Sequence, residues 1–469
     1  MKDADQTDLR ASAARSIVAT PVVSIRVSPH GYLTALLLAT FLSGLLFYLD
    51  MDPAGFAVFA LAWVVVPFLA LSDKIAFDGK RLQRTGLVPR LWAWFNNSRR
   101  RLKVSDIEQV ETQAVRAAKR GGNIFYRYRT TFRGKGLSVT VASGGEDYRQ
   151  MTRAILPLLP EHVLDIRSIE LRDHLNEPKE VLTKAEFAHI PSAEVLEGTL
   201  PTFAKKGQLV PHVSHADQDD TRAEDLQSLA NELRLSGYLL QALEAFRRAL
   251  VLKPSDARLL FEFARCLHSF AGVSRDRKLE RKAIAALRLS ERRAYGDSEL
   301  LNQLAETYFQ IGDWRRAGNI FQRVLDRFGE NFAAARGMAE LALREGKIAH
   351  VIHHFASANR VAETPALRRW TQNETDYFAR LNDDDEYMEM EISRVNLLDT
   401  VETSKKTALR ITMLAFPMIA IGLLFDDDLV ADIGWAVSTV SLLIWCGLGI
   451  TARMLSRRIP YELVHEEDN

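Results

Sequence analysis

Apolar residues gather into four long stretches of the chain. Each stretch is free of Lys and Arg, and within each pair only a short acidic turn separates the two stretches. Eighteen helical residues span roughly 27 Å, which is close to the thickness of a hydrocarbon core. The pattern therefore predicts two transmembrane helical hairpins, in which the four apolar stretches are Tyr32–Leu49, Ala54–Leu71, Ile411–Phe425 and Leu429–Ile450.

The basic residues beside these stretches predict an orientation. Lys and Arg precede and follow each hairpin, for example Arg26, Lys74, Lys405 and Arg453, whereas neither turn contains one. Under the positive-inside rule both termini and the 72–405 region should be cytoplasmic. The two cysteines, Cys266 and Cys446, cannot form a disulfide scaffold and fit a reducing compartment.

Short strands of period two follow the first hairpin. Runs of β-branched and aromatic residues separated by glycine turns predict strands, and an amphipathic helix is expected at 146–159. The expected strands are 74–77, 81–87, 107–115, 124–132 and 136–142, with turns at Asp78-Gly79, Gly121-Gly122 and Gly134–Gly136.

This order resembles the bacterial pleckstrin-homology-like (PH-like) domains of small membrane proteins. The residues that carry the resemblance are KRLQRTGL at 80–87 and LKVSDIEQVE at 102–111. The resemblance implies a small β-rich module at 73–170 in a protein of the bacterial inner membrane. The insertion at 92–97 is not part of the family pattern.

The module is strongly basic, with a net charge of +11 over residues 73–135, although the whole chain carries only +1. Basic residues beside a membrane gain about 1 kcal/mol each from an anionic leaflet, which favours lipid contact. The candidate lipid contacts are Trp92, Trp94, Arg99, Arg100 and Arg101. A topology signal alone and nonspecific nucleic-acid binding are the alternatives, and no specific nucleic acid is expected.

Residues 171–222 predict a linker, because prolines interrupt it and periodicity is lost. One short helix is expected near 183–188. His212, His215 and Asp217 lack a rigid element to hold a metal.

An internal repeat follows the linker. A small residue recurs at Ala230, Ala264, Ala305 and Ala339, and a bulky one at Phe246, Leu287, Phe321 and Phe355. The spacing is 34 residues except for one seven-residue insertion around 271–278. Such a period is typical of stacked helix pairs.

These positions closely resemble the tetratricopeptide repeat (TPR), which implies an all-α solenoid of three to four units over 223–362. The resemblance implies a concave groove lined by each unit's first helix. Its candidate peptide-binding residues are Gln227, Asn231, Arg234, Arg265, Asn302, Glu306 and Arg336. Repeats that clamp the C-terminal carboxylate of a peptide use Lys, Asn and Arg at defined positions. This chain departs from that set, since the other clamp positions hold Gln227, Glu262, Glu299 and Gln303. The alternative to peptide binding is that the candidate residues form a solvated helix face.

The remaining segments offer no chemistry of their own. Residues 371–403 carry ten Asp and Glu against two Arg, which indicates a solvated helical connector. His350, His353 and His354 have helical spacing, but no Cys or carboxylate joins them. No phosphate loop, nucleophile elbow or paired metal-ligand motif occurs, so we expect neither an enzyme nor a cofactor or metal.

The sequence thus predicts a multidomain membrane protein with four transmembrane helices, a PH-like module and a TPR solenoid. The function expected is a membrane-anchored scaffold for protein–protein interaction; a lipid sensor or an envelope-modifying enzyme is the alternative. The partner, a protein or peptide in the groove, is not identifiable. The expected segments are 1–31 (N-terminal segment), 32–71 (hairpin), 73–170 (PH-like), 171–222 (linker), 223–362 (TPR), 363–407 (acidic connector), 408–452 (hairpin) and 453–469 (tail).

Overall fold

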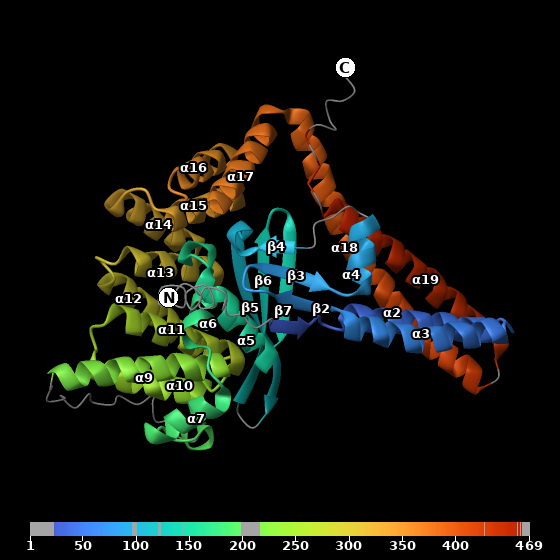
Figure 1. Ribbon diagram of the computed structural model, residues 1–469, viewed down its shortest axis with the longest axis horizontal. Coiled ribbons are helices and arrows are strands. Elements are labelled where there is room, and N and C mark those ends of the chain that lie inside the picture. The colour runs from blue at the N-terminus through green and yellow to red at the C-terminus, as the bar shows by residue number, and fades with distance from the viewer. Residues whose placement is uncertain are drawn as a thin grey trace, which may run out of the picture. The chain divides into compact units, whose positions relative to one another are not determined.

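The computed structural model (Figure 1) describes residues 23–95, 101–120, 123–143, 145–197, 216–425, 427–456, 458–459 and 461. The predicted Gly121-Gly122 turn, His212 and His215 lie outside these residues. The described chain is mostly helical, with two small antiparallel sheets. It forms two compact units: one contains the residues up to 37, 61–341 and 357–371, and the other 38–60, 342–356 and the residues from 372 on.

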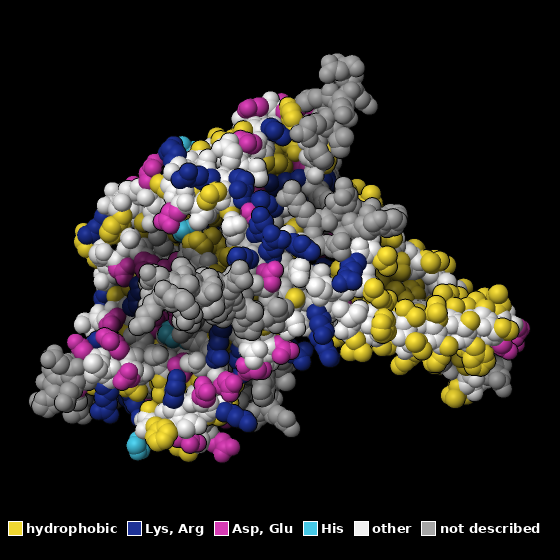
Figure 2. Space-filling model, viewed as in Figure 1, with side chains coloured by type: hydrophobic (Ala, Val, Ile, Leu, Met, Phe, Trp, Pro, Cys, Tyr) yellow, Lys and Arg dark blue, Asp and Glu magenta, His cyan; other side chains and the backbone are white. Residues whose placement is uncertain are grey.

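Four described helices are long and apolar enough to cross a membrane. Their bounds overlap the four predicted stretches, but α18 is 40 residues long because it also includes much of the acidic connector. Large apolar side chains cover the outside of these helices (Figure 2). The helices are α2 (His30–Tyr48), α3 (Asp52–Ser72), α18 (Asp385–Leu424) and α19 (Asp428–Leu455).

Within the second unit, the two predicted hairpins pack against each other. Phe41 of α2 contacts the ring of Trp435 of α19 at a centroid distance of 5.2 Å, and the Tyr48 hydroxyl donates to Asp432 over 2.7 Å. α18 and α19 approach closely at glycines, since a Cβ at Gly434 would lie 2.7 Å from the Ile419 nitrogen. Small residues at helix contacts are typical of association in membranes.

The first sheet contains two strands that the sequence analysis missed, one at each edge of the sheet. β1 (Val23–Arg26) pairs with β2 (Lys74–Phe77), so a segment before the first apolar stretch joins the sheet after the second. β3 (Arg81–Thr85) and β4 (Arg101–Lys103) complete the order β1-β2-β3-β4.

Helix α4 (Leu87–Phe95) is a further element that was not predicted. It follows β3 through Gly86, whose added Cβ would lie 3.0 Å from the Asp73 Cα atom. Asp73 is fully buried, and it accepts hydrogen bonds from the Tyr32 hydroxyl and from Arg84. These contacts fix α4 beside the end of α3.

The second sheet has the order β5-β6-β7, with β5 (Gln109–Arg120), β6 (Asn123–Gly134) and β7 (Leu137–Ser143). The predicted closing helix is α5 (Glu146–Ile155), which continues into a short 3₁₀ turn. Both sheets and α5 share one core that includes Ile75, Leu82, Phe132 and Tyr148.

The predicted linker contains regular, packed structure. α6 (Ile166–His174) crosses the boundary expected at residue 171 between the PH-like module and the linker. α7 (Pro178–Phe187) is longer than the short helix expected near 183–188. Leu171 of α6 belongs to the core of the sheets, and Val181 of α7 is buried against the first repeat helices. Residues 171–187 therefore belong to the folded first unit, contrary to the expectation of a linker.

The repeat region consists of successive helix pairs that match the predicted units. The recurring alanines and the bulky residues of the second helices are buried. The pairs are α9 (Ala216–Ser236) with α10 (Leu239–Leu252), α11 (Ala257–Ser274) with α12 (Arg277–Arg293), α13 (Ser298–Ile311) with α14 (Trp314–Phe328), and α15 (Phe332–Arg344) with α16 (Ile348–Arg360).

The turn inside each pair needs a left-handed residue. Gly237, Gly312 and Gly346 have φ values of 92°, 93° and 71°, and Arg275 with φ 55° takes this role in the second unit. The seven-residue insertion does not form a loop, because only Arg275 and Asp276 separate α11 from α12. It lengthens the two helices. α17 (Pro365–Asp383) follows the array.

Candidate functional site

The first helices of the first two repeat units face α6 of the same chain. α6 contacts both β5 and α9, so it lies between the second sheet and the repeat array (Figure 1). The Asp165 side chain caps the helix by accepting from the Ser168 amide over 3.0 Å. Along the first two units, the predicted groove is therefore occupied by α6 rather than open to solvent.

A buried chain of hydroxyl groups holds α6 on the second sheet. The Ser168 hydroxyl lies 2.7 Å from that of Thr112 on β5, which lies 2.9 Å from that of Thr130 on β6. The Thr130 hydroxyl in turn lies 2.6 Å from that of Tyr148 on α5. Each hydroxyl can donate one hydrogen bond and accept another, so each of the four has a partner within the network.

Glu170 of α6 binds two arginines of the array. Its Oε1 atom lies 2.9 Å from Nη2 of Arg234 on α9 and also contacts Nη1 of Arg265 on α11. All three side chains are largely buried. Burial by itself raises the pKa of Glu170, but the positive charges of Arg234 and Arg265 outweigh it and lower the pKa to about 2. Glu170 is therefore an ionised carboxylate shared by two successive repeats.

Two more predicted groove residues stabilise a neighbouring carboxylate. Gln227 and Asn231 donate to the same Glu262 oxygen over 2.8 and 2.7 Å, and Asn231 accepts from Arg234 over 3.2 Å. Asn231 is only 2% exposed. Burial raises the pKa of Glu262, and the two amide donors oppose that rise.

The third and fourth units contribute the other predicted residues. Asn302 donates to Asn331 over 3.0 Å, and Arg336 pairs with Glu340 over 2.8 Å and lies over the Trp370 ring. Burial raises the pKa of Glu306 to about 7, although the nearby Arg336 charge opposes the rise. The array thus holds further charged groups beyond Glu170, and Arg265 lies near both Glu170 and Glu306.

These contacts correct the expectation of a solvent-facing groove. All seven predicted residues are buried or half-buried, and Asn231, Arg234 and Arg265 contact other groups of this chain. Their binding of an external peptide stays a prediction. The sequence analysis missed Glu170, whose only signal was the pattern of Ile166 and Leu171 beside it on a short amphipathic helix.

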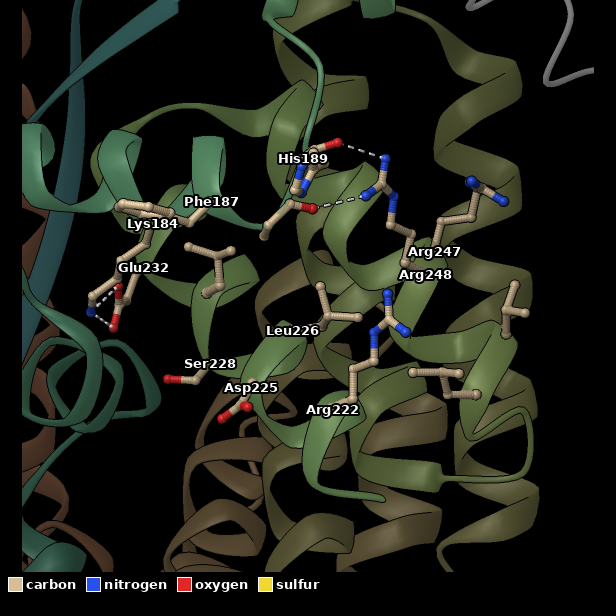
Figure 3. Close-up of a pocket in the computed structure, with 14 residues that line it drawn as sticks. Lys184, Phe187, His189, Arg222, Asp225, Leu226, Ser228, Glu232, Arg247 and Arg248 are labelled. Atoms are coloured by element: carbon tan, nitrogen blue, oxygen red, sulfur yellow. Dashed lines mark hydrogen bonds and ion pairs between the residues drawn. The ribbon is translucent and has the colours of Figure 1, made fainter. Parts of the chain in front are cut away.

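A pocket of about 820 Å³ lies at the opposite side of the first repeat, where α7 covers α9 and α10 (Figure 3). Leu226, Leu229 and Leu252 contribute apolar wall, and charged side chains of both signs line the rest of the pocket. Lys184 pairs with Glu232 over 2.9 Å, and Arg248 donates to the carbonyls of Ala188 and His189 at the end of α7. The pocket is an amphipathic surface on the first terminal repeat.

The candidate lipid-contact residues lie on and after α4. Trp92 and Trp94 belong to this helix, but their side chains are outside the described residues, as are Arg99 and Arg100. Arg101 begins β4 and is exposed. Leu87 and Leu91 of α4 are exposed as well, Leu91 by 64%.

Within the described part of the chain, no group of three or more His, Cys, Asp and Glu side chains is placed to hold a metal ion. His353 and His354 of α16 contact each other at a ring distance of 5.3 Å. Burial raises the pKa of the Cys266 thiol to about 12, so it is inert at neutral pH.

No model of a known protein family matches the chain, and no curated protein matches it either. Among solved structures it is similar to a chain of the APC/C hetero-tetramer Cut9-Hcn1, with 13% identity and a TM-score of 0.28. That match covers 67% of this chain and about half (52%) of the other. A de novo designed 16-helix transmembrane nanopore matches with 13% identity and a TM-score of 0.10, covering 59% of this chain and 91% of the other. With TM-scores this low, neither likeness bears on function.

Proposed function

We propose that this protein is a membrane-anchored scaffold that binds other proteins through its helical repeat array. The observation that carries the proposal is the contact between α6 and the array, in which Arg234 and Arg265 hold a helix-borne carboxylate. A stack of helix pairs offers such a face because a single pair cannot bury its own surfaces. In this proposal the chain is not an enzyme and needs no cofactor.

The finer details of the proposal follow from the sequence. The array and the β-rich module, which we propose to be PH-like, would lie at the cytoplasmic face of a bacterial inner membrane. The absence of Lys and Arg from both hairpin turns supports this orientation. The apolar surfaces of α2, α3, α18 and α19 support the anchoring.

Site-specific photocrosslinking in native membranes tests the scaffold function. A photoreactive residue would replace Phe187 at the rim of the α7 pocket, His268 on α11 or Leu289 on α12, one at a time in the full chain. We expect protein adducts of defined mass from at least one of these three positions. The control is the same residue at Lys80, in the turn between β2 and β3. If all three positions give only the adducts seen at Lys80, the scaffold function is wrong.

A second function, contact with anionic lipid, is supported by α4. Leu87, Val88 and Leu91 are exposed apolar residues on a helix that begins beside the end of α3. A helix with an apolar face and nearby basic residues binds at the membrane interface. Arg101 and the basic residues that precede it would then meet lipid headgroups.

Spin labelling tests the lipid contact. A label at Leu91→Cys, in a chain where Cys446 is Ser, should be more accessible to membrane-soluble oxygen than to a water-soluble nickel chelate. A label at Lys80→Cys serves as the aqueous control. If oxygen and the nickel chelate reach the two positions equally, α4 does not contact lipid, and the basic residues serve only as a topology signal.

A further inference from the structure

Glu170 connects two successive repeats through a single oxygen atom. Its Oε1 atom contacts both Arg234 of the first unit and Arg265 of the second. Such a carboxylate between arginines is a charge-assisted contact, the strong kind of hydrogen bond. The array therefore contains a built site for one carboxylate carried on a helix.

The fit of α6 to this site is incomplete. The second carboxylate oxygen of Glu170, the Nε atom of Arg234 and the Oδ1 atom of Asn302 are buried without a hydrogen-bond partner in the described structure. Buried polar atoms without partners cost free energy. A ligand carboxylate that used both of its oxygens on the two arginines would pair the Arg234 Nε atom, which α6 leaves without a partner.

We propose that the concave face recognises an acidic helix of a partner protein, and that α6 is a built-in competitor for that site. The proposal rests on the proposed scaffold function and names its partner chemistry. The partner's helix carries a carboxylate that takes the place of Glu170 between Arg234 and Arg265.

The contacts of α6 indicate whether it would separate from the array or from the second sheet. The Thr112–Ser168 contact and the Asp165 cap tie α6 to the second sheet. The partner would therefore displace the array from α6 and leave α6 on the sheet. Apolar contacts also cross this interface, since Leu235 and Phe332 of the array belong to the same core as Phe132. Competition must overcome these contacts as well as the ion pairs.

A peptide probe tests the competition. The probe is a fluorescent synthetic peptide with the sequence of residues 161–177, added to the full chain in lipid nanodiscs and followed by fluorescence anisotropy. In the Glu170→Lys chain, three buried cations meet and α6 no longer competes. We expect the peptide to bind this chain at least about fivefold more tightly than the wild type, within the usual range of coupling between competing contacts.

The controls separate charge recognition from general loosening. Asp173→Asn changes an exposed carboxylate on the same helix, which pairs only with Arg172 among the described residues, and should bind the peptide as the wild type does. Adding Arg265→Glu to Glu170→Gln, where α6 carries no charge at position 170, should abolish binding of the peptide, while a peptide with Lys at position 170 should recover it. Glu170→Gln is the milder variant and decides the question if Glu170→Lys does not fold.

The proposal is overturned if neither Glu170 variant binds the peptide more tightly than the wild type, because α6 is then a permanent part of the fold. This outcome is distinct from failure of the scaffold function. If the wild type and Glu170→Gln crosslink to the same partners in the same amounts, the scaffold function stands but the competition by α6 is wrong. If the Glu170 variants bind the peptide more tightly but no partner is crosslinked, the competition by α6 stands but the scaffold function is wrong.

Discussion

At the scale of single residues, the array depends on how much room its helix contacts leave. Gly337 of α15 lies against the ring of Phe321, and an added Cβ would come within 2.3 Å of that ring. Phe321 is 4% exposed, so its ring cannot move aside easily. Gly318 of α14 differs, because its added Cβ would meet only the Leu341 side chain at 3.5 Å.

This difference predicts opposite effects of the same substitution. Gly337→Ala should destabilise the protein by about 1–3 kcal/mol through overpacking. Gly318→Ala should stabilise it by about 0.5–1 kcal/mol. Alanine has less conformational entropy than glycine in the unfolded chain, and its Cβ fits the space beside Leu341. Thermal unfolding of the full chain in detergent measures both. Equal midpoints for the two variants would contradict the close contact at Gly337.

The carboxyl group of Glu306 predicts a pH dependence of stability. Its pKa is raised to about 7 by burial, against 4.5 for the free side chain, and Arg336, Arg265, Asp165 and Glu340 are the charged groups near it. Because the folded state holds the proton more tightly, the contribution to stability is complete below pH 4.5. It is lost as the pH rises through 7.

Glu306→Gln should remove this loss. The variant and the wild type should differ little in stability near pH 4.5, and the variant should become the more stable of the two by pH 8. Urea unfolding at a series of pH values measures the difference. If the difference in unfolding free energy between the two proteins is the same at every pH in this range, Glu306 is not the group whose titration changes the stability.

At the scale of elements, the α18–α19 hairpin is held by backbone approach at glycines. A Cβ at Gly422 would lie 2.4 Å from the Ala431 nitrogen, and one at Gly434 would lie 2.7 Å from that of Ile419. Gly447 has no heavy atom within 4 Å of its added Cβ. The three glycines lie in the membrane-length helices α18 and α19 but have different surroundings.

Gly434→Leu should therefore force α18 and α19 apart and lower the thermal midpoint of the detergent-solubilised protein. Gly447→Leu, in the same helix, should leave the midpoint nearly unchanged. Loss of stability in both variants to the same extent would indicate a general intolerance of leucine in α19 rather than a close helix contact.

At the scale of the whole molecule, the charges beside the four apolar helices predict one topology. A reporter that is active only outside the cytoplasm should work when it is inserted near Asp52 or Asp427, in turns that lack Lys and Arg. It should be silent when it is inserted between residues 198 and 215. Activity at the internal position with silence at the two turns would reverse the proposed orientation.

The sequence by itself determined the features that depend on local periodicity. Eighteen uncharged residues in a row predict a membrane-length helix, and a 34-residue period predicts stacked helix pairs, because both signals lie within one element or its neighbour. The left-handed turns at Gly237, Gly312 and Gly346 belong to the same class, since only glycine reaches that conformation at no steric cost. Ala305 and the other recurring alanines are buried for the same reason: the two helices of a unit pack closely there.

Only the tertiary structure decided which distant groups meet. β1 pairs with β2 across two apolar helices, and neither strand's pattern names its partner. Glu170 meets Arg265, 95 residues away, and no periodicity links an acidic residue to a particular arginine. A polar residue on a short helix is compatible with solvent or with a buried ion pair. The choice between them depends on the desolvation and charge that the rest of the fold brings to it.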